Sequence, residues 1–190
     1  MSFKKKVGLL LFIGLGLFVF KLSNVNQNQH LSYYTLHTPN KSFIKEVEKK
    51  VIVQINPEEN YSYAVMEAGV IQHLDRTYTY DYIPEILNGG ILYQGMHRPV
   101  KGTIVSIELF EPADIFFFFH HTVDGGYTEI FKNEIDWQEC FDNPKYDVYN
   151  GDHGKYMKMF KLSSEAGKFE IPATTKDRAC FSIVFKFIIL

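Results

Sequence analysis

The chain has 190 residues, of which 46% are hydrophobic and 16% are aromatic. This length and composition suit one domain with a sizeable core and a short appendage, whereas two full domains would be cramped. The formal net charge of -2 and the pI near 6.4 argue against a nucleic-acid-binding protein, which usually presents a basic face and has a high pI.

Residues 1–22 are predicted to form a hydrophobic leader helix that acts as a signal peptide or a signal anchor. Three lysines, at positions 4 to 6, precede an uncharged apolar run over residues 7–20. This run is shorter than the roughly 20 residues that a membrane-spanning helix needs, and no typical small-residue cleavage motif follows it. We therefore expect a protein of the secretory pathway that is extracellular or luminal. Its leader is either cleaved or retained, in which case residues 7–20 anchor the protein in the membrane. Residues 23–40 are predicted to be a polar linker.

Two further features agree with this location. Asn40 and Asn60 each begin an Asn-x-Ser sequon, so both are predicted glycosylation sites. Cys140 and Cys180 would close a loop of about forty residues, and a disulfide is the expected state in an oxidising compartment. Two buried thiols are the alternative.

The remaining segment, residues 41–190, is predicted to be a single all-β domain. Residues 103–110 alternate between apolar and polar side chains, which predicts a half-buried strand. Residues 115–119 are apolar at every position, which predicts a central strand covered on both faces. Further strand patterns occur over residues 51–55, 61–65, 77–82, 156–162, 168–171 and 181–190. Residues 31–36, within the linker, could form a short edge strand. The expected architecture is an antiparallel, immunoglobulin-like β-sandwich.

A polar, irregular segment over residues 132–154 follows the predicted central strands. It combines aromatic rings with carboxylates and carboxamides, and carbohydrate sites use this mixture because rings cover sugar faces while polar groups bind hydroxyls. The predicted ligand-binding residues in and next to this segment are Tyr127, Trp137, Tyr146, Tyr149, Asp124, Lys132 and Asn143. Trp137 has a second interpretation as a core anchor.

Two motifs in this part of the chain resemble a known family. The segment KGTIVSIELFE at residues 101–111 is followed by a strand and then by TVDGGY at residues 122–127. This order resembles a family 21 carbohydrate-binding module, the starch- and glycogen-binding β-sandwich that also occurs in glycogen-targeting regulatory subunits of protein phosphatase 1. Gly126 stands where the family has a tryptophan, and Tyr127 is the neighbouring ring. The resemblance covers residues 99–190 and implies binding of a polysaccharide such as an α-glucan or glycogen.

Two alternative functions remain open. A secreted or luminal β-sandwich can instead mediate protein–protein interaction, because folds of this kind host many functions. The resemblance also includes phosphatase regulatory subunits, but the chain contains no Arg/Lys-Val-x-Phe docking peptide of the phosphatase-binding type.

The sequence does not predict an enzyme, a cofactor or a metal site. His120, His121, Asp124 and His153 are the candidate metal ligands, but adjacent residues of a strand point to opposite faces, so the first two cannot act together. No pair of carboxylates has an arrangement that identifies a glycosidase. We therefore expect a non-catalytic binding domain.

Overall fold

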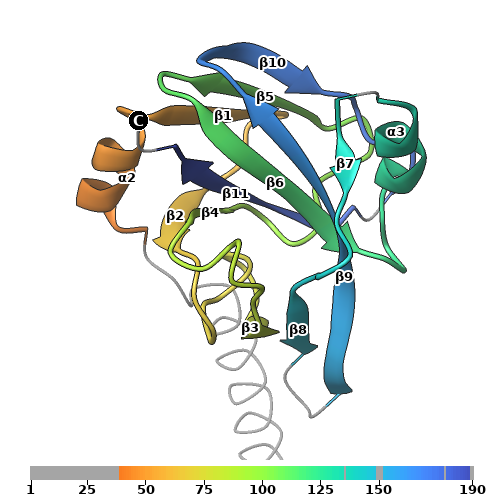
Figure 1. Ribbon diagram of the computed structural model, residues 1–190. Helices are drawn as coiled ribbons and strands as arrows, with labels where there is room; N and C mark the ends of the chain where they lie inside the picture. The colour runs from red at the N-terminus through yellow and green to blue at the C-terminus, as the bar shows by residue number, and fades with distance from the viewer. Residues whose placement is uncertain (1–38, 135, 149–151, 178, 189–190) are drawn as a thin grey trace, which may run out of the picture.

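The computed structural model describes residues 39–188 except 135, 149–151 and 178. The predicted leader and nearly all of the predicted linker lie outside the described residues. The elements in chain order are α2 Lys41–Val47, β1 Val51–Asn56, β2 Ser62–Val65, β3 Thr79–Tyr82, β4 Ile91–Gln94, β5 Ile104–Leu109, β6 Ala113–His120, α3 Tyr127–Asn133, β7 Gln138–Glu139, β8 Lys145–Val148, β9 Asp152–Ser164, β10 Gly167–Ile171 and β11 Phe181–Phe187 (Figure 1). None of the helices in the described part is long and apolar enough to span a membrane.

The strands form two antiparallel sheets, which confirms the predicted all-β sandwich. The smaller sheet has the order β1-β5-β10, and the larger has the order β2-β4-β11-β6-β9-β8-β3, with β7 paired to β9. The main core contains buried apolar residues from both sheets. A second core covers the other face of the larger sheet.

Strand β6 is the central strand that the sequence predicts. It lies between β11 and β9, and its residue Phe117 pairs with Ile183 on one side and Phe160 on the other. Because side chains alternate along a strand, Phe117 belongs to the main core and Phe118 to the second core. The run of phenylalanines is buried because each face of β6 has a core of its own.

Strand β5 confirms the prediction of a half-buried strand. Val105, Ile107 and Leu109 are buried in the main core, whereas the residues between them are only partly buried. Ser106 and Glu108 occupy the outer face, where they contact side chains of β10.

The Gly125-Gly126 turn leads into helix α3, which the sequence pattern did not indicate. Both glycines have positive φ angles, 59° and 94°, which favour glycine. Asp124 accepts a hydrogen bond of 3.0 Å from the backbone N–H of Gly126. Tyr127 and Phe131 follow at helical spacing, and both are buried in the main core. This short segment is therefore an amphipathic helix and not part of an open loop.

The predicted disulfide is wrong, because Cys140 and Cys180 are both thiols in the structure. Cys140 follows β7 and its backbone N–H bonds to the carbonyl of Met159 in β9. Cys180 immediately precedes β11, so β9 and β6 lie between the two cysteines in the sheet. Strands are spaced by about 4.8 Å, which puts the pair about 14 Å apart. A disulfide needs Cα atoms within about 7 Å.

Candidate functional site

A surface groove runs between the segment that follows α3 and strands β9 and β10. Its volume is about 660 Å³. One wall consists of Glu134, Asp136, Trp137 and Gln138, and the opposite wall consists of residues 161–170. We call this site the Trp137 groove. It is formed because the chain leaving α3 turns back to pair β7 with β9 (Figure 1).

Trp137 connects this groove to the interior of the protein. The side chain is half-buried, and its ring lies 4.6 Å from the ring of Phe131 and 6.5 Å from that of Phe117. It therefore packs against the main core while it also lines the groove. The two interpretations of this tryptophan, core anchor and site residue, are compatible in the structure.

Polar groups surround the exposed part of the tryptophan. Glu134, Asp136 and Gln138 are exposed, and their side chains make no hydrogen bond or ion pair with other described residues. Across the groove, Lys161 is paired with Asp114 at 2.8 Å. The first wall therefore presents hydrogen-bonding groups that are available to a polar ligand.

Two of the predicted ligand-binding rings are buried, which corrects their assignment. Tyr127 is 0% exposed in the main core, and Tyr146 is 4% exposed in the second core. Tyr146 stacks on His120 with ring centroids 3.9 Å apart. A ring enclosed on both faces cannot stack on a sugar. The cause is that both residues belong to regular elements, α3 and β8, and not to loops.

The other predicted residues do not gather around the groove. Asp124 caps the turn before α3; burial alone would raise the pKa of its carboxyl, but hydrogen bonds from Gly126 and Thr128 lower it below its ordinary value. Lys132 is exposed at the end of α3, and Asn143 is half-buried in the connection before β8. Tyr149 lies outside the described residues. Of the six predicted residues that the structure describes, Trp137 alone lines the Trp137 groove.

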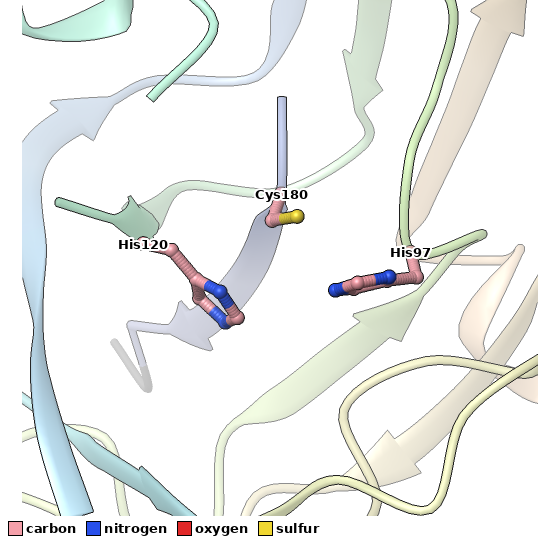
Figure 2. Close-up of side chains that lie close together, drawn as sticks. All are labelled: His97, His120 and Cys180. Atoms are coloured by element: carbon pink, nitrogen blue, oxygen red, sulfur yellow. The ribbon is translucent and has the colours of Figure 1, made fainter. Parts of the chain in front are cut away.

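A second group of side chains that could bind a ligand is buried at the edge of the second core. His97, His120 and Cys180 each offer one ligand atom, and these atoms lie within 4.8 Å of one another (Figure 2). Of the candidate metal ligands named from the sequence, this group includes only His120, which is buried, whereas the adjacent His121 is exposed. Sequence reasoning missed it because the three residues come from three different strand ends.

Burial keeps the imidazoles of this group neutral. Desolvation, followed by neighbouring positive charge, lowers the pKa of His97 to about 3 and that of His120 to about 4. Burial also lowers the pKa of the adjacent His73 well below its ordinary value. The pKa of the Cys180 thiol is raised to about 11 by burial, and Arg98 partly offsets this effect. Neutral imidazoles keep a lone pair for a ligand or a metal ion.

The fold and the groove define a β-sandwich domain with an open surface site. No family model matches the sequence, and no curated protein matches it significantly. Among solved structures, the domain resembles part of a beta-glucuronidase from glycoside hydrolase family 2, with a TM-score of 0.51 and 15% identity over 68% of this chain and 14% of that chain. A GH138 enzyme targeting pectin rhamnogalacturonan II matches with a TM-score of 0.45 and 12% identity, over 70% of this chain and 16% of that chain. The chain thus spans about a seventh of each enzyme, and the first likeness shows a shared fold.

Proposed function

We propose that the domain is a non-catalytic carbohydrate-binding module whose ligand lies in the Trp137 groove. The observation that carries this proposal is a partly exposed tryptophan in an open groove, next to three polar side chains that lack partners among the described residues. Trp137 would stack on the apolar face of a sugar ring, while Asp136 and Gln138 would bind its hydroxyl groups. An α-glucan such as glycogen is the first candidate ligand, because of the resemblance to family 21 modules.

The exposure of the groove favours binding over catalysis. A glycosidase uses one carboxylic acid that its surroundings keep protonated, usually by burial. Glu134, Asp136 and Glu170 line the groove, but all three are exposed. An open site of this kind gives modest affinity, so we expect dissociation constants between micromolar and millimolar, about 4–8 kcal/mol of binding free energy.

A different surface favours protein–protein interaction as the second candidate function. Tyr82, Lys145 and Tyr156 lie opposite one another across β3, β8 and β9. Both tyrosines are more than 40% exposed, and the nearby Phe141 is 96% exposed. Exposed aromatic residues of this kind are enriched at protein interfaces. A protein bound here would leave the Trp137 groove accessible.

Affinity electrophoresis and calorimetry with glycogen, amylose, cyclodextrin and a panel of acidic and neutral polysaccharides test the proposal. Trp137→Ala and Gln138→Ala remove the ring and a hydrogen-bonding group of the groove, while Phe141→Ala is the matched control outside it. We expect the parent and the control to bind at least one polysaccharide, and Trp137→Ala to weaken binding about tenfold or more, because tenfold corresponds to about 1.4 kcal/mol.

Two results would contradict the proposal. One is a parent protein that binds none of the polysaccharides. The other is unchanged affinity in a Trp137→Ala variant whose circular dichroism shows that it is folded. Selective loss of binding in Phe141→Ala would instead move the site to the aromatic surface.

A further inference from the structure

The buried cluster of His97, His120 and Cys180 is assembled by strand pairing. Strand β6 pairs with β11, so His120, at the end of β6, lies beside Cys180 and donates its backbone N–H to the Cys180 carbonyl at 3.1 Å. Strand β4 pairs with the other side of β11, and the chain that leaves β4 brings in His97. The backbone N–H of His97 is held by the Asp75 carboxylate at 2.8 Å. Figure 2 shows a ring nitrogen of His97 directed towards the space between His120 and Cys180.

The cluster is buried and contains polar atoms that lack partners. His97, His120 and Cys180 are 3%, 4% and 1% exposed. His73 is 0% exposed, its ring lies 5.1 Å from that of His97, and neither of its ring nitrogens has a hydrogen-bond partner among the described residues. The Nδ1 atom of His97 has none either. A buried polar group without a partner destabilises the folded state, so several such groups in one place point to a missing ligand.

The neighbours of His120 fix both its orientation and its tautomer. The amide nitrogen of Gln72 donates to the carbonyl of Thr79 at 3.1 Å, so the amide oxygen faces His120 Nε2 at 3.3 Å. Nε2 must therefore carry the proton, and Nδ1 carries the lone pair. Tyr146 stacks on the same ring and holds its plane. Metal-binding histidines usually have an outer hydrogen bond of this kind.

We propose that His97, His120 and Cys180 bind a first-row transition-metal ion of the zinc type, with His73 or a water molecule in the fourth position. Two imidazoles and a thiolate are ligands that zinc prefers. Tetrahedral bonds of about 2.0–2.3 Å place ligand atoms about 3.3–3.8 Å apart. The present spread of up to 4.8 Å closes with side-chain shifts of about 1 Å. The thiol proton is released when the metal–sulfur bond forms.

The surroundings provide charge compensation and a route for the ion. Arg76 is paired with Asp75 at 2.7 Å, which reduces its repulsion of a cation. Arg98 lies near Cys180 and favours the thiolate form. A surface pocket of about 590 Å³ is lined by Met96 and Arg98, the chain neighbours of His97, together with Asp75. An ion in the cluster would tie together β4, β6 and β11, so its role is structural and is independent of the Trp137 groove.

Cobalt spectroscopy of the full chain tests the proposal, because Co²⁺ bound to a thiolate gives an intense near-ultraviolet charge-transfer band. The chain has two cysteines, so a band that persists in Cys140→Ser must arise from Cys180. After treatment with a chelator and a reductant, we expect one Co²⁺ per chain, displaced by one Zn²⁺, in the parent, in Cys140→Ser and in the exposed-neighbour control His121→Ala. Cys180→Ser and His97→Gln should lose the band and weaken binding by more than roughly 100-fold.

Thermal unfolding gives an independent measurement. Stoichiometric Zn²⁺ should raise the melting temperature of the parent and of Cys140→Ser, since a ligand that binds only the folded state stabilises it. The proposal is overturned if the folded parent shows neither a thiolate band nor a thermal shift. It is also overturned if the band disappears in Cys140→Ser, which would place metal binding at the other cysteine. The two decisive samples are the parent and Cys140→Ser, and both keep the cluster intact. The test therefore does not depend on whether a variant of the cluster folds.

Discussion

The packing of Trp137 predicts how the domain responds to loss of this ring. Truncation of a fully buried aromatic residue to alanine costs about 3–5 kcal/mol. Trp137 is half-buried, with one close ring contact to Phe131 at 4.6 Å and a more distant one to Phe117. We therefore expect Trp137→Ala to reduce the free energy of unfolding by about 2–3 kcal/mol, including about 0.5–1.5 kcal/mol from the aromatic pair.

Unfolding by heat and by urea, followed by far-ultraviolet circular dichroism, measures this change. Fluorescence is unsuitable because Trp137 is the only tryptophan. The expected loss corresponds to a decrease of about 4–12 °C in melting temperature for a domain of this size. The control Phe141→Ala removes a side chain that is 96% exposed and should change stability by less than about 0.5 kcal/mol.

Two results would refute this reasoning. If Trp137→Ala is as stable as Phe141→Ala, the tryptophan does not pack against the main core. If the variant is unfolded at room temperature, the ring is a full core anchor, and its exposed part is too small to be a sugar platform. An intermediate loss of stability is expected only of a residue that serves both the core and the groove.

Three further predictions follow from the turn, the thiols and the histidines. Gly126→Ala should lower the free energy of unfolding, measured in urea, by more than about 1 kcal/mol, because φ is +94° and a Cβ atom would overlap Oγ1 of Thr175. Gly89→Ala, with φ of +72° and nothing within 4 Å, is the control that isolates the backbone cost. Thiol titration of the denatured, unreduced protein should find two thiols per chain, and a result of none would restore the disulfide. In the metal-stripped protein, the pKa values of His97 (about 3) and His120 (about 4) lie below the unfolded value of about 6.5. Stability should therefore be complete above about pH 6.5 and fall as the pH decreases, by up to about 1.4 kcal/mol per pH unit for each histidine. A flat profile between pH 6.5 and pH 5 would show that the rings are not buried as neutral groups.

The two central strands could be predicted because their own residues determine their environment. Residues 115–119 of β6 are all apolar, which predicts that both faces of the strand are covered, whereas β5 alternates, which predicts that one face is covered. Helix α3 was missed because it has only seven residues, and its buried positions, Tyr127 and Phe131, are few enough to fit a loop. The predicted sugar-binding role of Tyr127 failed for the same reason.

The disulfide and the histidine cluster depended on information that local patterns do not contain. The even number of cysteines and the expected compartment favoured a bridge, but the order of strands in the sheet separates the two thiols. That same order brings Cys180 next to His120 and His97. The cluster could be predicted only if it were known that β11 pairs with both β4 and β6. No residue in these three strands specifies which strand lies beside it.

The two faces of β6 keep the two proposed sites apart. Phe117 faces the main core and contacts Trp137, which lines the groove. His120 lies on the opposite face of β6, stacks on Tyr146 of the second core and belongs to the proposed metal-binding cluster. Because the central strand of a sandwich separates two independently packed faces, the failure of one proposal leaves the other unaffected. A sheet of this kind can therefore hold a structural ion on one side while the opposite side supports a ligand groove.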